Sequence, residues 1–211
     1  MSHSPINLMD NQILDLPKGQ LVTLKTYLSM PIQTVSEPLA LPSGFVLSPL
    51  LASELARYRT LFSTVGQNWL WFSRLLMDDP HLFEELNQPS RQIFALQAQG
   101  RDCGLLELFH ETAANRSDPT TDLAFLGLDL SLRGQGLGTI LVRHAIQLAA
   151  QQGATRLSVN TCQLDDPLAL GFYQARGFQI DKLALEILTD PRHLGLYPKS
   201  SAPHIPLSPD R

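Results

Sequence analysis

The sequence predicts a single domain of mixed α and β structure, an α/β (α+β) fold. With 211 residues, of which 44% are hydrophobic, the chain is long enough to form one sizeable core. Three patterns indicate elements around that core: an alternating run at residues 20–30, two strand-like runs joined by a turn at 90–111, and a glycine-rich loop between a strand and a helix at 121–151. We therefore expect the domain to span residues 20–189.

The elements of the N-terminal half follow from local patterns. Apolar and polar residues alternate over 20–30, which predicts the first strand. Prolines and glycines then indicate a connector that ends near Pro49. Residues 50–76 are expected to form two helices interrupted near Gly66, and a short helical turn is expected at 81–86.

Three strands are expected in the middle of the chain, at residues 90–97, 103–111 and 121–128. The first two are separated only by a short polar turn that contains a glycine. They are therefore predicted to pair as an antiparallel hairpin.

A helix, a strand and a second helix are expected to follow. Residues 137–151 place their apolar side chains on one helical face, and Gly153 can end that helix. A short strand is predicted at 155–160 and a second helix at 167–176. Another strand is expected to begin at Phe178.

The two ends of the chain carry no recognisable motif. Residues 1–19 are polar and mixed, which predicts a flexible N-terminal arm. Residues 190–211 are rich in proline and serine, and we expect them to form either an extended cover or a disordered tail.

Composition excludes several classes of function. The net charge of −4 argues against a broad nucleic-acid surface, and no apolar run is long enough to span a membrane. No secretory signal layout is visible, and Cys103 and Cys162 lie in apolar patterns typical of reduced core thiols. The six histidines are scattered, so no metal site is expected. These features predict a cytoplasmic protein.

The most informative segment reads LGLDLSLRGQGLG and runs from Leu126 to Gly138. Arg133 is followed by Gly134, Gly136 and Gly138 at alternate positions, directly before the predicted helix. Closely spaced glycines allow several backbone N–H groups to converge on an anion, and the positive end of the helix dipole lies behind them. This arrangement predicts a pyrophosphate-binding loop.

Two common phosphate-binding motifs do not fit this loop. A Walker-type loop requires lysine followed by serine or threonine after its last glycine, whereas Thr139 and Ile140 follow Gly138. A dinucleotide fingerprint counted from Gly134 requires glycine at the position of Thr139, and no acidic residue follows at the expected distance.

The remaining pattern, Arg-Gly-x-Gly-x-Gly after an L-x-L strand end, resembles the acyl-CoA loop of the GNAT N-acetyltransferase superfamily. The later segment DDPLALGFYQARGF resembles the second signature of the same family: an alanine four residues before a tyrosine, and a Gly-Phe pair that closes the helix. The two signatures occur in the expected order, and the resemblance covers residues 91–180.

The resemblance implies a central mixed, mostly antiparallel sheet of about six to seven strands, flanked by helices and splayed between its fourth and fifth strands. It also implies acetyl-CoA as co-substrate, without a metal. The acceptor would be a primary amine of a small molecule or a peptide, acetylated by direct transfer in a ternary complex. The alternative is a non-catalytic acyl-CoA sensor or regulatory domain.

The residues expected to bind CoA lie in the loop, at the end of the strand before it, and at the start of the second signature. They are Leu126, Leu128, Arg133, Gly134, Gln135, Gly136, Leu137, Gly138, Thr139 and Asp166. Asp166 departs from the asparagine that is frequent at its position in the family. A carboxylate lacks amide donors but still suits the start of a helix.

Two residues are candidates for proton transfer. Tyr173 matches the tyrosine of the second signature and would return a proton to the leaving thiolate. Asp122 would act as the base through a water, with Glu107 and Glu111 as rivals. Strand periodicity predicts one shared face for Asp122, Ala124, Leu126 and Leu128.

The acceptor pocket is expected in the helical stretch after the first strand. Trp69 and Trp71 lie close together there and could stack on a substrate or hold a cationic amine, with Glu107 as a further contact. Edge strands at the C-terminal side offer a surface for a homodimer.

Overall fold

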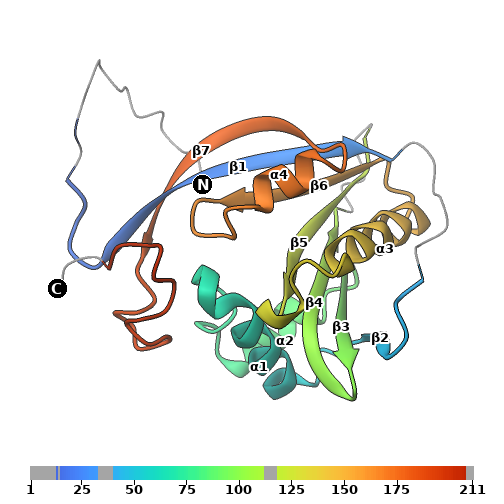
Figure 1. Ribbon diagram of the computed structural model, residues 1–211, viewed down its shortest axis with the longest axis horizontal. Helices are drawn as coiled ribbons and strands as arrows, with labels where there is room; N and C mark the ends of the chain where they lie inside the picture. The colour runs from blue at the N-terminus through green and yellow to red at the C-terminus, as the bar shows by residue number, and fades with distance from the viewer. Residues whose placement is uncertain (1–12, 14, 33–39, 112–117, 208–211) are drawn as a thin grey trace.

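A seven-stranded sheet in the order β2-β3-β4-β5-β6-β1-β7 forms the centre of the protein (Figure 1). The computed structural model describes residues 13, 15–32, 40–111 and 118–207. The strands are β1 (Gln20–Pro31), β2 (Phe45–Pro49), β3 (Arg91–Ala98), β4 (Arg101–His110), β5 (Thr120–Leu128), β6 (Arg156–Cys162) and β7 (Gln179–Thr189). The α-helices are α1 (Leu55–Gly66), α2 (Asp79–Leu86), α3 (Leu137–Gln151) and α4 (Ala169–Gln174). The predicted mixed sheet flanked by helices is confirmed.

The sheet opens between β5 and β6. These strands pair in parallel only from Thr120 to Leu123 of β5, whereas every other neighbouring pair in the described part of the sheet is antiparallel. The last five residues of β5 therefore have no strand partner on the β6 side. The splay was predicted between the fourth and fifth expected strands, at residues 121–128 and 155–160. It lies between these two stretches, which are β5 and β6 because β2 was not predicted.

The strand predicted at residues 20–30 is confirmed, and its partners come from the C-terminal half of the chain. β1 is inserted between β6 and β7, where Leu28 lies opposite Val159 on one side and opposite Ile180 on the other. The strand that precedes the helices is instead β2, within the segment predicted to be a connector. β2 is short, lies at the sheet edge and ends at Pro49, so its sequence pattern is weak.

The second of the two helices predicted within residues 50–76 is absent. A 3₁₀ turn, Gln67–Trp69, follows α1, and Leu70 then adopts a left-handed backbone conformation with φ of 54°. An L-residue in that conformation ends a right-handed helix. The chain continues as turns to α2. Asp78 caps this helix at its N-terminus, because its side chain accepts from the backbone N–H of His81.

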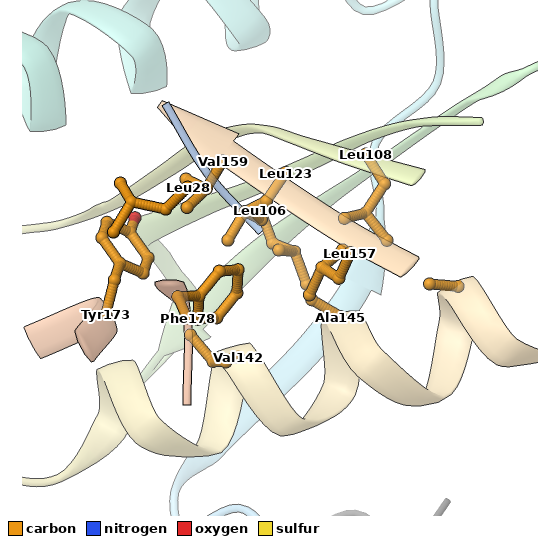
Figure 2. Packing of buried hydrophobic residues seen from close by; sticks show 11 residues of the cluster. Leu28, Leu106, Leu108, Leu123, Val142, Ala145, Leu157, Val159, Tyr173 and Phe178 are labelled. Atoms are coloured by element: carbon orange, nitrogen blue, oxygen red, sulfur yellow. The ribbon is translucent and has the colours of Figure 1, made fainter. Parts of the chain in front are cut away.

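The two faces of the sheet are covered by different helices. On β4, Leu106 and Leu108 pack against α3 and α4, whereas Leu105 packs against α1 and α2, as strand periodicity requires. Figure 2 shows Val142 and Ala145 of α3 directed toward the sheet. A layer of buried apolar side chains thus lies on each side of the strands that carry the site.

The segment after β7 folds back around a buried ion pair. Asp190 and Arg192 are almost fully buried and paired at 2.8 Å. Arg192 also donates to the backbone carbonyl oxygens of Ser201, Ile205 and Pro206. Residues 190–207 are thereby packed as a compact cover without a regular helix or strand.

The predicted N-terminal arm, C-terminal tail and homodimer are not tested by the structure of one chain. Residues 1–12, 14 and 208–211, parts of the predicted arm and tail, lie outside the described residues. β7 is an edge strand with exposed Leu183, Leu185 and Ile187, but the homodimer stays a prediction. In the described ranges, no helix combines the length and apolarity needed to cross a membrane.

Candidate active site

Two adjacent cavities meet at the splay between β5 and β6. The first, here called the strand cavity, has a volume of about 360 Å³ and lies between residues of β5, β6, β1 and β7 and the turn after α1. The second, the loop cavity, has a volume of about 500 Å³ and lies between the glycine loop, α4 and the end of β5. Both are lined by Trp69, Leu126, Asp166, Ala169 and Tyr173. A molecule in one cavity can therefore meet a molecule in the other at these residues.

A β-bulge at Ala124 sets the direction of the β5 side chains. Glu107 lies opposite Phe125 and Leu108 opposite Leu123, so Ala124 is the extra residue. The bulge reverses the alternation, because Leu123 and Leu126 both pack on the α3 side. The prediction that Asp122, Ala124, Leu126 and Leu128 share one face is therefore wrong.

The glycine loop lines the loop cavity with backbone groups. Gly134 and Gly136 have φ angles of 74° and 78°, and a Cβ on either would extend into open space. Within the described part of the chain, the backbone N–H groups of residues 134–138 donate no hydrogen bond. Together with the start of α3, these donors form a cradle suited to an anion. Gln135 turns away and donates to the carbonyl oxygen of Ser131.

Arg133, Asp166 and Trp69 meet where the two cavities join. The Arg133 guanidinium forms an ion pair with Asp166 and lies 5.4 Å from the centre of the Trp69 ring. Asp166 also accepts from the backbone N–H of Leu168 at 3.0 Å and so fixes the start of the α4 turn. The predicted phosphate-binding arginine thus contacts the residue that departs from the family pattern.

Arg176 is a second cation of the loop cavity and was not predicted from the sequence. It donates to the carbonyl oxygen of Phe172 and to the hydroxyl of Thr139, and its guanidinium lies 3.5 Å from the Phe172 ring centre. Its Nε atom is buried and has no hydrogen-bond partner among the described residues. The sequence signal that could have identified Arg176 is its position as a basic residue in the last helical turn of the second signature.

Tyr173 lines both cavities and is 7% exposed. Its ring packs edge-on against Phe172 with 5.2 Å between ring centres. It packs in the same way against Phe178, at 5.5 Å (Figure 2). Burial, together with the charges of Asp165 and Asp122, raises the pKa of the phenol above its usual value near 10. The hydroxyl therefore keeps its proton over the physiological pH range.

Neither Asp122, the predicted base, nor Glu107, the predicted substrate contact, lines either cavity. Asp122 lies where β5 and β6 are still paired and accepts from the hydroxyl of Ser158 at 2.9 Å. Burial raises its pKa. Glu107 is fully buried below α1, where it binds Arg74, Arg91 and the hydroxyl of Tyr58 at 2.9, 2.5 and 2.6 Å. Since Glu107 is enclosed by these groups, it is positioned to anchor the turn that carries Arg74.

Trp71 forms a wall of the strand cavity because two glycines make room for it. A Cβ on Gly66 would approach Trp71 to 2.6 Å, and one on Gly127 would approach it to 3.1 Å. The indole N–H donates to Asp165 at 3.1 Å. Trp69 also faces this cavity, so both predicted tryptophans line it.

The C-terminal cover reaches the same wall. Tyr197 donates a hydrogen bond from its hydroxyl to the carbonyl oxygen of Trp71, and the His204 ring lies 5.7 Å from that of Trp69. Tyr197 and Ala202 also pack with Leu70 and Leu164. No local pattern in the sequence indicated this contact, because it depends on the fold of the whole segment.

Solved structures with a similar fold include acetyltransferases. An aminoglycoside acetyltransferase from an uncultured soil metagenomic sample matches with a TM-score of 0.55 and 20% identity, over 65% of this chain and 90% of that one. A GCN5-related N-acetyltransferase from Sphaerobacter thermophilus matches with a TM-score of 0.58 and 10% identity, over 79% of this chain and 51% of that one. A ribosomal-protein-alanine N-acetyltransferase from Brucella melitensis matches with a TM-score of 0.51 and 13% identity, over 65% and 94%. At these identities the likeness shows the fold.

Sequence comparison identifies the family. No curated protein matches the sequence. The family model described as "Acetyltransferase (GNAT) family" matches residues 59–178, which is more than half of the 211 residues and includes the glycine loop and α4. The chain belongs to the GNAT acetyltransferase family.

Proposed function

We propose that the protein transfers an acetyl group from acetyl-CoA to a primary amine, with both substrates bound together. The observation that carries this proposal is the junction of the two cavities at Tyr173 and Leu126. Membership of the family implies acetyl-CoA as the donor. The loop cavity would hold the donor and the strand cavity the amine, so that the thioester and the nitrogen meet at the splay.

The residues of the loop cavity fit a pyrophosphate. The free N–H groups of residues 134–138 provide neutral donors, and Arg133 and Arg176 provide positive charge at the two sides of the loop. Thr139 lies beside Arg176 and can add a hydroxyl. The Arg133 side chain would leave Asp166 in order to reach a phosphate.

The unpaired end of β5 supplies the next groups. Because β6 departs after Leu123, the backbone N–H and C=O groups that follow on that side are not used in the sheet. Leu126 and Leu128 line the loop cavity, and we assign their backbone to the pantetheine arm and to the oxyanion of the tetrahedral intermediate. Such a donor typically lowers the activation barrier by about 3 kcal/mol.

We assign the return of the proton to the thiolate to Tyr173 and the deprotonation of the amine to a water near Asp122. Tyr173 lines both cavities and holds its proton, as a general acid must. Asp122 lies outside the strand cavity, so a water relay is required for its role. The raised pKa of Asp122 favours proton uptake.

Isothermal titration with acetyl-CoA, run beside ATP and NAD, tests the donor site. We expect saturable binding of acetyl-CoA and none of the controls. Release of free thiol during incubation with an amine panel then tests transfer. Since the aminoglycoside acetyltransferase of similar fold was also solved with sisomicin, small amines are the first panel to test. Acetyl-CoA binding without thiol release from any amine would contradict the catalytic proposal.

A further inference from the structure

The charges around the strand cavity are unequal. Lys25 and Glu186 both line it and form an ion pair with each other at 3.3 Å. Asp166 is paired with Arg133. Asp165 is the remaining charged residue of the lining, and no ion pair within the described ranges involves it.

Asp165 is held in place entirely by neutral donors. One carboxylate oxygen accepts from the indole N–H of Trp71 at 3.1 Å. The other accepts from the hydroxyl of Thr161 and the backbone N–H of Cys162, both at 2.8 Å. These three bonds fix the carboxylate at the cavity wall, and none of their donors carries a charge. The cavity therefore presents a preorganised negative charge.

Aromatic rings line the cavity around this charge. Trp69, Trp71, Phe72 and Tyr173 all contribute to the lining. Aromatic faces attract cations and accommodate the methylene groups beside them. The walls and the carboxylate thus share a preference for a positively charged group on an apolar chain.

In the proposed mechanism the attacking nitrogen loses its proton to the water near Asp122, which leaves the Asp165 carboxylate for a second amino group. The attacking nitrogen must lose its proton before it reacts, and a neighbouring carboxylate stabilises the protonated form. A carboxylate in the acceptor site is most effective when it binds a second cationic group that does not react. We infer that Asp165 selects acceptors with two amino groups, one bound to Asp165 and the other directed to the acetyl donor. This inference rests on the proposed function.

Binding and turnover of two matched amines test the inference separately. Cadaverine has two amino groups on a five-carbon chain, and pentylamine has one. The two tryptophans of the chain, Trp69 and Trp71, both line the cavity, so intrinsic fluorescence reports binding there. Either amine can place one ammonium on Asp165, but only cadaverine then has a second amino group for the thioester, so we expect its kcat/KM to be at least about tenfold higher than that of pentylamine.

Asp165→Asn should reduce the affinity for both amines about tenfold and remove the preference for cadaverine in kcat/KM. Glu84→Gln removes the same charge from an exposed position on α2 and should change neither affinity. If Asp165→Asn does not fold, Asp165→Ser keeps an oxygen near the N–H of Cys162 and still lacks the charge. Retention of the cadaverine preference in a folded, uncharged variant overturns the inference.

The inference and the proposed function fail in different ways. Equal kcat/KM values for the two amines in the wild-type protein overturn the inference, even though pentylamine is then acetylated and the proposed function holds. Amine binding that depends on Asp165, in a protein that acetylates no amine, supports the binding site and contradicts the transferase.

Discussion

The guanidinium of Arg133 and the carboxylate of Asp166 form an ion pair across the junction of the two cavities, with 48% and 27% of their side chains exposed. Asp166 thus competes with a phosphate for the arginine of the glycine loop. Since exposed pairs contribute about 0–1 kcal/mol, the competition is weak but measurable.

We therefore expect Asp166→Asn to tighten acetyl-CoA binding about two- to fivefold. The asparagine can still accept from the N–H of Leu168 but no longer neutralises Arg133. Arg133→Ala should weaken binding about tenfold, because a charged contact to phosphate is lost. Isothermal titration measures both. Weaker binding by Asp166→Asn would mean that the carboxylate itself assists the donor.

Gly136→Ala should affect stability and ligand binding together. Gly136 has φ of 78°, and an alanine there would be strained by about 1–2 kcal/mol while its methyl group extends into the loop cavity. Gly153 has φ of 79° and the same open surroundings after the far end of α3. Gly153→Ala should show a similar loss in urea unfolding and no change in acetyl-CoA affinity. Equal affinity in both variants would argue against the loop as the phosphate site.

Tyr173→Phe should lower kcat about 100-fold and leave the melting temperature nearly unchanged, since the ring packing is retained. Because the raised pKa keeps the phenol protonated, the wild-type kcat should show no decline from this group up to about pH 10. Tyr27→Phe makes the same change on β1, outside both cavities, and should be neutral. If the wild-type kcat declines well below pH 10 because Tyr173 loses its proton, Tyr173 is excluded as the acid.

Asp122→Asn should make the protein more stable at neutral pH. Burial raises the pKa of Asp122, so the folded protein binds this proton more tightly than the unfolded chain, whose aspartates titrate near 3.9. The free energy of unfolding of the wild type therefore falls as the pH rises above about 4, relative to the variant. Urea unfolding at pH 4 and pH 7 measures the difference, which should grow with pH. A kcat unchanged by the same variant would place the base elsewhere.

Local patterns predicted the parts of the site that are local in structure. The glycine loop and α3 follow from a motif whose conformation depends on adjacent residues, and α4 begins within two residues of its predicted start. The splay could be assigned through the family resemblance, because the two signatures follow the strands on either side of it.

The sequence could not show features that depend on strand partners. The bulge at Ala124 arises from the register with β4, and a one-residue insertion leaves no mark in the alternation of a mostly apolar strand. The position of β1 between β6 and β7 is likewise a choice of neighbours. Glu107 shows the same limit, since an acidic residue in a strand pattern can face solvent or a buried pair of arginines.

The C-terminal cover should determine amine binding without affecting the donor site. Arg192 holds three carbonyl oxygens of the cover and Asp190, and removing one partner of such a buried pair typically costs about 3–5 kcal/mol. We expect Arg192→Met to release residues 191–207, so that limited proteolysis cleaves there. The affinity for amines should then fall about tenfold, because Tyr197 and His204 no longer support Trp71 and Trp69.

Acetyl-CoA affinity should stay within about twofold in Arg192→Met, because none of the described residues of the cover lines the loop cavity. His204→Ala is the matched control: it removes only the ring that faces Trp69 and should reduce amine affinity less than Arg192→Met does. A parallel loss of acetyl-CoA and amine binding would show that Arg192 supports the whole fold. The cover would then have no separate role in the acceptor site.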